Sequence, residues 1–254
     1  MTPGIVLITG AATRIGRAIA LALGVAGWGV VVHYHRSKEA AADVVAEIEN
    51  AGSRAISLAA DLTDPQQTLD LVPVAAKALG PVDCLINNAA LFEHDDIESL
   101  DSASWGAHLS VNLTAPLMLT QAFASQLPTG VIDGNVINII DQRVWNPTPY
   151  FVSYTLSKAG LWTMTQTLAL ALAPRIRVNG IGPGPTLASV RQSQADFEQQ
   201  WRSLPLQRRT DLQDICEAVI YILGARAMTG QMIALDNGQH LSWSPAHRSQ
   251  AAKE

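Results

Sequence analysis

Cysteine is scarce in this chain of 254 residues. Only Cys84 and Cys216 occur, far apart and without C-x-x-C spacing, which argues against a disulfide framework or a cysteine zinc site and fits a reducing compartment. Charge is also sparse: 15% of residues are charged, and the net charge is −5. No basic run exceeds the pair Arg208 and Arg209, so the sequence predicts no nucleic-acid partner.

Long apolar runs are missing as well. The longest, residues 18–32, is interrupted by three glycines and falls short of the ~18 residues of a membrane span. No basic segment with a cleavage site opens the chain. We therefore expect a cytoplasmic protein without a membrane partner. What the chain has is a 48% hydrophobic fraction, enough for a sizeable core in one large domain.

Short apolar runs alternate with amphipathic stretches along most of the chain. We predict strands at residues 5–8, 29–33, 55–59, 84–87, 136–140 and 177–181, with helices at 39–50, 65–79, 115–127 and 152–173. The strands lack polar alternation, as is typical of strands covered on both faces. The predicted fold is a single α/β domain over residues 1–243, a doubly wound parallel sheet of Rossmann type with helices on both faces. Residues 182–209 are expected to form a substrate flap, and residues 244–254 a disordered tail.

The turn after the first strand is typical of a phosphate site. Gly10 ends the strand and Gly16 lies in the first turn of the next helix, where backbone N–H groups would face an anion. Arg14 stands between them and would place a guanidinium beside the pyrophosphate of a dinucleotide. The same spacing also fits an ordinary strand-to-helix turn.

The second strand separates these two interpretations. It is not followed by the acid that would hold a ribose 2′-hydroxyl in an NAD site. His33, Tyr34, His35, Arg36 and Ser37 stand there instead, and they can offer hydrogen bonds and positive charge to a 2′-phosphate. NADPH is therefore the expected cofactor. In the alternative, His33 and His35 only satisfy backbone groups in a solvated loop.

Two further strand ends contribute to the expected cofactor site. Asp61 and Leu62 follow the third strand and are placed to meet the adenine. Asn88 and Ala89 follow the fourth strand and are placed on the ribose side. Either pair also fits a simple strand end.

Tyr154 and Lys158 are four residues apart at the start of a predicted helix, so their side chains share one face. A phenol with a pKa of about 10 is a poor acid or base at neutral pH, but a nearby ammonium favours its phenolate. The spacing also occurs on ordinary exposed helices.

Several motifs together resemble the short-chain dehydrogenase/reductase family over residues 5–241. They are Thr9 and Gly10 with Gly16, Asn87 to Ala89, Asn112, Tyr154 with Lys158, and Pro183 with Gly184. The resemblance implies hydride transfer from a nicotinamide cofactor, with Tyr154 as proton donor, Lys158 holding the nicotinamide ribose and Asn112 keeping a relay water in place. It also implies a homotetramer and places Ile15, Pro183 and Gly184 at the cofactor.

Two positions depart from the common family pattern. Asp141 stands 13 residues before Tyr154, where most members have serine, and Arg14 replaces a small residue. With His33 to Ser37, they look like the pteridine reductase branch, and dihydromonapterin reductases are similar. That branch implies that Arg14 contacts both cofactor phosphate and pterin, and that Asp141 joins Tyr154 in proton delivery.

The same branch implies further substrate contacts. Phe92 matches an aromatic that stacks the pterin against nicotinamide. Independently of the resemblance, we expect the flap over the substrate to be lined by Trp145, Leu187, Phe197 and Trp201. Ala90 and Trp243 depart from the branch, where a serine and a basic tail residue are usual.

Other interpretations stay open for these residues. Phe92 alone also fits a core aromatic, Asp141 a structural acid beside Arg143 or Arg14, and the flap aromatics ordinary loop anchors. No histidine has a second ligand at useful spacing, so no metal is expected.

The sequence favours an NADPH-dependent reductase of a pterin or dihydropteridine. One alternative is a generic short-chain carbonyl reductase acting on a 3-oxoacyl thioester or a sugar ketone. Another is a non-catalytic protein that only senses NADP(H).

Overall fold

A computed structural model of the chain describes residues 3–128, 130, 133–189 and 191–241. Trp243 and the tail expected at 244–254 lie outside these residues. No helix in the described ranges is both long and apolar enough to cross a membrane.

The described residues form one parallel sheet in the order β3-β2-β1-β4-β5-β6-β7. The strands are β1 (Ile5–Ile8), β2 (Gly29–Tyr34), β3 (Ala55–Ala59), β4 (Cys84–Asn87), β5 (Gly134–Ile139), β6 (Ile176–Pro183) and β7 (Met232–Leu235). From β1 the chain runs outward to β3, then crosses to β4 on the other side of β1. The doubly wound fold predicted from the sequence is confirmed.

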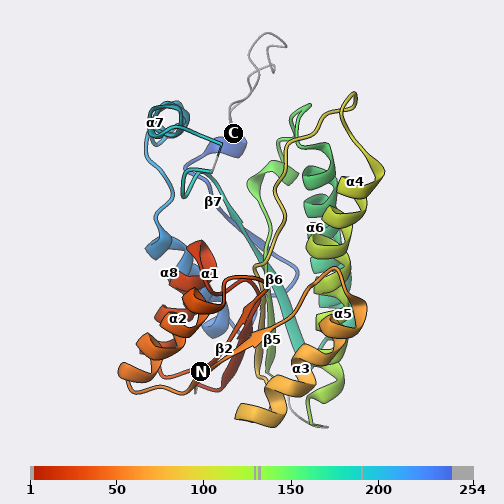
Figure 1. Ribbon diagram of the computed structural model, residues 1–254, viewed down its shortest axis with the longest axis vertical. Coiled ribbons are helices and arrows are strands. Elements are labelled where there is room, and N and C mark those ends of the chain that lie inside the picture. Colours follow the sequence, from red (N-terminus) through yellow and green to blue (C-terminus); the bar gives the residue numbers. More distant parts are fainter. Residues whose placement is uncertain (1–2, 129, 131–132, 190, 242–254) are drawn as a thin grey trace.

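Helices cover both faces of the sheet (Figure 1). One face packs against α1 (Arg14–Val25), α2 (Lys38–Asn50) and α8 (Leu212–Gly224). The other packs against α3 (Pro65–Leu79), α5 (Ala115–Gln126) and α6 (Val152–Leu172). Successive β1 residues serve the two layers in turn: Val6 and Ile8 join the first, Leu7 the second, and all three are fully buried. This two-sided burial explains the apolar runs in the sequence.

Several helical segments escaped the sequence prediction. The helix expected at 115–127 is preceded by α4 (Ser102–Leu109) and by a π-helical turn, η1 (Ser110–Thr114). The flap region contains α7 (Gln194–Arg202), and α8 follows it. Helix α7 begins with a capping box between Ser193 and Asp196, a signal that was available in the sequence. Only Phe197 of its residues is buried, so it has no apolar stripe to reveal it.

Candidate active site

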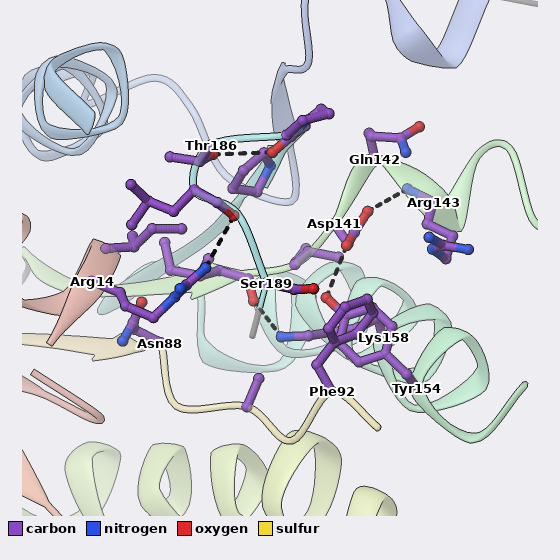
Figure 2. Close-up of a pocket in the computed structure, with 18 of the residues that line it drawn as sticks. Arg14, Asn88, Phe92, Asp141, Gln142, Arg143, Tyr154, Lys158, Thr186 and Ser189 are labelled. Carbon is purple, nitrogen blue, oxygen red and sulfur yellow. Dashed lines mark hydrogen bonds between the residues drawn. The ribbon is translucent and has the colours of Figure 1, made fainter. Parts of the chain in front are cut away.

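A cavity of about 430 Å³ opens at the carboxyl ends of β1, β4, β5 and β6, where the chain reverses direction across the sheet and ligands of such folds bind. Twelve of the residues expected at the site line it: Gly10, Arg14, Ile15, Asn88, Ala89, Phe92, Asp141, Tyr154, Lys158, Pro183, Gly184 and Leu187. Arg14 and Asp141 therefore share one cavity (Figure 2).

Hydrogen bonds between residues that directly follow β1 and β4 hold the turn before α1 in place. The Thr9 hydroxyl accepts hydrogen bonds from the backbone N–H groups of Asn88 (2.9 Å) and Ala89 (3.0 Å). The Asn88 amide in turn donates to the carbonyl oxygens of Thr9 (2.8 Å) and Gly10 (3.1 Å). A Cβ at Gly16 would lie 2.3 Å from the Gly10 oxygen, so only glycine fits there. The turn leaves its backbone exposed to close approach by a ligand.

The His33 side chain is hydrogen-bonded to this turn. Its Nδ1 accepts the backbone N–H of Gly10 at 3.0 Å, so its Nε2 carries the hydrogen and donates to the Ala60 oxygen at 3.1 Å. The side chain is 2% exposed, and burial lowers the pKa of His33 from 6.5 to about 4. A buried, neutral ring with both nitrogens engaged cannot hold a 2′-phosphate. His33 instead takes the alternative role of satisfying backbone groups.

The remaining residues expected near the adenosine are not among those that line the cavity. His35, Arg36 and Ser37 are exposed and Tyr34 is half-buried. His35 Nε2 lies 3.5 Å from an Asp61 carboxylate oxygen, and hydrogen bonds from Thr63 lower the pKa of Asp61.

The side chain of Leu62, unlike that of Asp61, is buried in the core layer that α3 covers. Only the Leu62 backbone is therefore free to contact a ligand.

Tyr154 and Asp141 form a hydrogen-bonded pair in the cavity. The Tyr154 hydroxyl donates to Asp141 Oδ2 at 2.8 Å, and Asp141 Oδ1 accepts the backbone N–H of Arg143 at 2.7 Å (Figure 2). The carboxylate comes from the end of β5 and the phenol from the first turn of α6. The pair can hold one proton between two oxygens beside the cavity.

Lys158 lies one turn further along α6 and is 2% exposed. Its ammonium donates to the Ile139 carbonyl oxygen at 2.7 Å and lies 5.8 Å from the centre of the Tyr154 ring. Burial lowers the pKa of Lys158 from 10.5 to about 8, while the negative charge of Asp141 acts in the opposite direction. Lys158 is therefore still charged at neutral pH and places a cation behind the phenol.

Asn112 lies in the π-helical turn η1 and is fully buried, but it is not among the residues that line the cavity. Its Oδ1 accepts the backbone N–H of Leu91 at 2.8 Å. Its Nδ2 donates to the Leu91 carbonyl oxygen and to the Ser157 hydroxyl, both at 3.0 Å. These bonds join the segment before Phe92 to helix α6. The relay water assigned to Asn112 by resemblance stays a prediction.

Phe92 lines the cavity and packs on a second aromatic. Its ring is stacked on Phe151 with centres 4.5 Å apart and planes 8° apart, and meets Tyr154 at 71° with centres 4.7 Å apart. Phe151 adopts a left-handed backbone conformation with φ of 56°. One face of the Phe92 ring is thus covered by Phe151, and the Arg191 guanidinium carbon lies over the same ring, 5.2 Å from its centre.

Arg14 holds the flap. Its backbone is left-handed, with φ of 53°, a conformation that favours glycine. Its guanidinium donates to the carbonyl oxygens of Ala188 (3.1 Å) and Leu187 (3.2 Å). From the other side, Arg191 donates to the Phe92 oxygen at 2.6 Å and pairs with Glu93 at 2.8 Å. The flap is therefore attached to both walls of the cavity.

Trp201 does not line the cavity, in contrast to the expectation. Its ring lies beneath Arg202, 5.4 Å from the guanidinium carbon, whereas Phe197 and Gln200 of the same helix α7 line the cavity. Trp201 follows Phe197 by four residues and lies on the same side of α7, so helical spacing alone does not explain the difference.

Some cavity residues were not singled out in the sequence. Gln142, Gln192, Gln200 and Gln239 all line the cavity. The position of Gln142 directly after Asp141 was the one signal that could have found any of them.

The chain matches the family model for short chain dehydrogenase over residues 4–199. A 3-oxoacyl-[acyl-carrier-protein] reductase of Synechocystis sp. is 31% identical over 242 residues, covering 94% of this chain and 97% of the relative.

Two solved structures are more similar still. One is FolM alternative dihydrofolate reductase 1 from Brucella canis complexed with NADP, which is 46% identical with a TM-score of 0.92, covering 96% of this chain and 97% of that one. The other is the protein of the same name from Brucella suis, also in complex with NADP. It is 47% identical with a TM-score of 0.92, covering 95% of this chain and 96% of that one.

Proposed function

Because the chain belongs to the short chain dehydrogenase family, we propose that it is an NADPH-dependent reductase of a pterin or dihydropteridine. The observation that carries the proposal is that Arg14, Asp141 and Tyr154 line one cavity together with the Phe92 ring. A flat, nitrogen-rich ring needs a stacking surface, hydrogen-bond donors and a proton source, and these four residues offer all three. The two FolM structures, named as dihydrofolate reductases, support the same class of substrate.

The turn around Gly10 fits the pyrophosphate of NADPH. A side chain at Gly16 would collide with the Gly10 carbonyl oxygen, so glycine there lets the start of α1 pack closely on the turn after β1, as in a dinucleotide site. His35, Arg36 and Ser37 are exposed and would hold the 2′-phosphate. Both FolM structures are complexes with NADP, which supports the choice of cofactor.

Reduction of a ring C=N bond adds a hydride to carbon and a proton to nitrogen. NADPH, when bound, supplies the hydride. Tyr154 holds the proton at its hydroxyl oxygen, and Asp141 accepts the hydrogen of that hydroxyl at 2.8 Å. Once the phenol has given its proton to nitrogen, Asp141 would take one up from water and pass it to the phenolate oxygen. Lys158 holds positive charge behind the phenol, and its own bond to the Ile139 oxygen fixes its position. The flap, attached through Arg14 and Arg191, keeps water from the reacting atoms.

The test is oxidation of NADPH by wild-type protein on addition of a dihydropterin, compared with Tyr154→Phe. The substitution removes the proton donor and keeps the ring, so turnover should fall by about 10²- to 10⁴-fold while NADPH binding, measured by fluorescence, is retained. A Tyr154→Phe variant with most of its turnover would contradict the assigned role.

A generic carbonyl reductase is the second candidate, favoured by the likeness to the Synechocystis 3-oxoacyl reductase. Asp141 weighs against it, because its carboxylate accepts the hydrogen of Tyr154 and has none to donate to a carbonyl oxygen. Assaying an acetoacetyl thioester beside the dihydropterin separates the two candidates.

A homotetramer and a cytoplasmic location belong to the same proposal. Leu117 on α5 and Leu156 and Leu170 on α6 are 46%, 50% and 84% exposed. Such apolar residues on two adjacent helices support an interface between copies of the chain. Light scattering of the purified protein measures the assembly.

A further inference from the structure

Helix α6, which carries Tyr154 and Lys158, begins at a residue that cannot cap it. Its N-cap is Phe151, whose backbone is left-handed, with φ of 56° and ψ of 46°, and whose side chain accepts no hydrogen bond from the helix. An N-cap residue usually has an extended backbone and a side-chain oxygen that accepts an N–H group of the first turn. A bulky residue at positive φ is also strained. The start of α6 therefore needs a partner from elsewhere in the chain.

Asp95 is that partner, although it precedes Ser153 by 58 residues. Its carbonyl oxygen accepts the backbone N–H of Phe151 at 2.7 Å. Its carboxylate oxygens accept the N–H of Ser153, the second residue of α6, at 3.2 and 3.3 Å. Asp95 is 2% exposed and Ser153 is fully buried, so water does not compete for these bonds. Asp95 thus takes the place of an N-cap residue for α6.

Asp95 is also the last of three anchors in the segment that follows β4. The backbone N–H groups of Leu91 and Glu93 are bonded to the side chains of Asn112 and His108, which belong to η1 and α4. Of the three anchors, the one at Asp95 joins the segment to the start of α6. The two others stay when the Asp95 side chain is removed, so the loss should displace the first turn of α6 more than the segment itself.

Tyr154 directly follows the residue that the Asp95 carboxylate holds. It is the third residue of α6, in the turn whose N–H groups have no partner within the helix. Its hydroxyl donates to Asp141 Oδ2 at 2.8 Å, and its ring meets Phe92 at 71° (Figure 2). Asp141 follows β5 and Phe92 follows β4, so both contacts depend on where α6 begins relative to the sheet. A displaced first turn would carry the phenol away from both.

We propose that Asp95 is a positioning residue for Tyr154. It does not line the cavity and acts by fixing the first turn of α6, so that the phenol stays bonded to Asp141. The inference rests on the proposed function for the role of Tyr154 as proton donor. A negative charge also favours a helix N-terminus, but the hydrogen bonds to Ser153 require only an oxygen at the right place. Position and charge can therefore be separated by substitution.

The experiment compares Asp95→Ala, which removes the acceptor, with Asp95→Asn, which keeps an acceptor oxygen without the charge. A small misplacement of a catalytic group is costly, so Asp95→Ala should lower kcat for a dihydropterin by about 10- to 100-fold. KM and NADPH binding should be unchanged, because the substitution reaches neither Phe92 nor the Gly10 turn. Asn caps helices as well as Asp, so Asp95→Asn should keep most of its kcat. An Asn variant as slow as the Ala variant would overturn the inference.

Asp96→Ala is the matched control from the same segment. The Asp96 carboxylate accepts the N–H groups of Glu98 and Ser99 and the Ser99 hydroxyl, so its removal costs at least as many hydrogen bonds but none to α6. It should leave kcat unchanged. An equal loss of kcat in Asp96→Ala would assign the effect to general loosening of the segment and overturn the inference.

Amide hydrogen exchange gives a measurement that needs no substrate. Exchange in a peptide covering residues 150–156 should become faster in Asp95→Ala and stay as in the wild type in Asp95→Asn and Asp96→Ala. Unchanged exchange in Asp95→Ala would overturn the inference. If Asp95→Ala does not fold, Asp95→Glu replaces it, because glutamate keeps the charge and displaces the oxygens. Its kcat should fall below that of Asp95→Asn, and the reverse order would overturn the inference.

The proposed function fails in a different way from this inference. Wild-type protein that reduces an acetoacetyl thioester but no dihydropterin would reject the pterin substrate, and the same variants would then be compared on the thioester, since Tyr154 would serve either reaction. Wild-type protein active on neither substrate would reject the proposed function, and hydrogen exchange would then decide whether Asp95 fixes the turn that carries Tyr154.

Discussion

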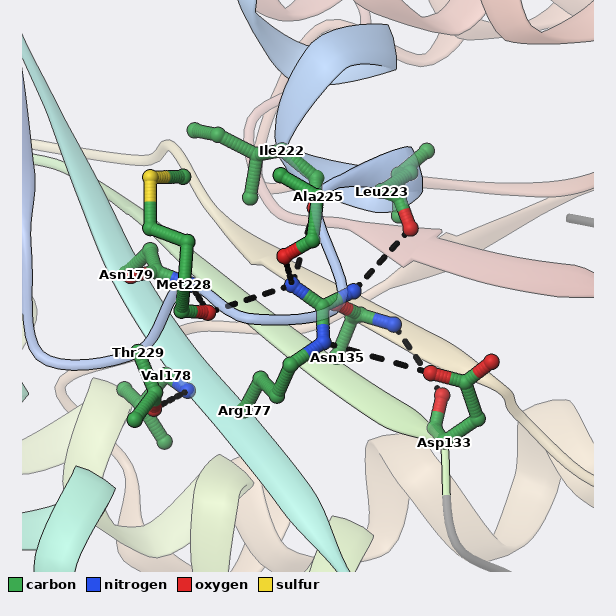
Figure 3. A network of polar contacts seen from close by, with 10 residues as sticks. All are labelled: Asp133, Asn135, Arg177, Val178, Asn179, Ile222, Leu223, Ala225, Met228 and Thr229. Atoms are coloured by element: carbon green, nitrogen blue, oxygen red, sulfur yellow. Dashed lines mark hydrogen bonds and ion pairs between the residues drawn. The ribbon is translucent and has the colours of Figure 1, made fainter.

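The two ends of the sheet each depend on an arginine, but the two are bound in opposite ways. Arg177, near the start of β6, donates to four carbonyl oxygens at or just beyond the end of α8 at 2.9 to 3.3 Å and lies 3.9 Å from an Asp133 carboxylate oxygen (Figure 3). Its side chain is 11% exposed. Arg14, at the opposite end, is exposed, has a left-handed backbone and makes two longer bonds to the flap.

This difference separates a structural arginine from one kept for a ligand. The last carbonyls of a helix have no partner within it, and Arg177 supplies one, so its position follows from helix α8. Arg14 is the first residue of α1, but its side chain bonds only the flap and no helix end, and its left-handed backbone costs free energy. Strained backbone of this kind is typical of functional sites, which agrees with the position of Arg14 at the cavity.

Of the substitutions that test this difference, replacing Arg177 should lower the stability of the protein most. Arg177→Met leaves the buried carbonyls at the end of α8 without donors, so the free energy of unfolding should fall by about 3 to 5 kcal/mol. Urea unfolding measures it. Arg226→Met, an exposed arginine beside α8, is the control and should have almost no effect. A loss as small as that of the control would show that the Arg177 network contributes little.

His33 is a buried side chain at the same end of the sheet as Arg14, and it should contribute to stability in a pH-dependent way. Its pKa is lowered from 6.5 to about 4, so the unfolded chain binds the proton more tightly. Its contribution to stability is complete above pH 6.5 and is lost as the pH falls toward 4. At 1.36 kcal/mol per unit the loss is about 3 kcal/mol.

Thermal unfolding from pH 7 to pH 4 checks this. His33→Gln, which can accept from Gly10 and donate to Ala60 without titrating, should flatten the decline, whereas His35→Gln, at an exposed residue, should not. An unchanged slope in His33→Gln would assign the acid sensitivity to other groups.

Arg14 should give the smallest effect on stability. In Arg14→Gly the strain is relieved, while two exposed hydrogen bonds are lost and the unfolded chain gains freedom, so the free energy of unfolding should change by less than about 1 kcal/mol. The KM for the pterin should nevertheless rise about 10-fold, because the flap loses its attachment. A large loss of stability with an unchanged KM would make Arg14 a structural residue like Arg177.

Much of the fold follows from local pattern. The bounds of β1, β3, β4 and α3 agree with the sequence prediction, because each is an apolar run or stripe that ends at a polar residue or glycine. The motif residues around Gly10 and Tyr154 likewise meet at one cavity, since parallel strands place their carboxyl ends together.

What escaped prediction depends on contacts between distant segments. Nothing in residues 110–114 announces a π-helical turn, whose position is fixed by bonds from Asn112 to Leu91 and Ser157. The burial of His33 depends on Ala60 and Gly10, which follow strands β3 and β1. The placement of Trp201 away from the cavity depends on how α7 packs. Such contacts have no local signature in the chain.

The bond between His33 and Gly10 also limits how a phosphate can be received. The Gly10 N–H points at the imidazole, so an anion in the first turn must take its hydrogen bonds from amides further along. Protonation of the ring would turn that nitrogen into a second donor facing the first, 3.0 Å away. Acid would then push the dinucleotide turn away from the second strand, and cofactor binding should weaken as the pH falls toward 4.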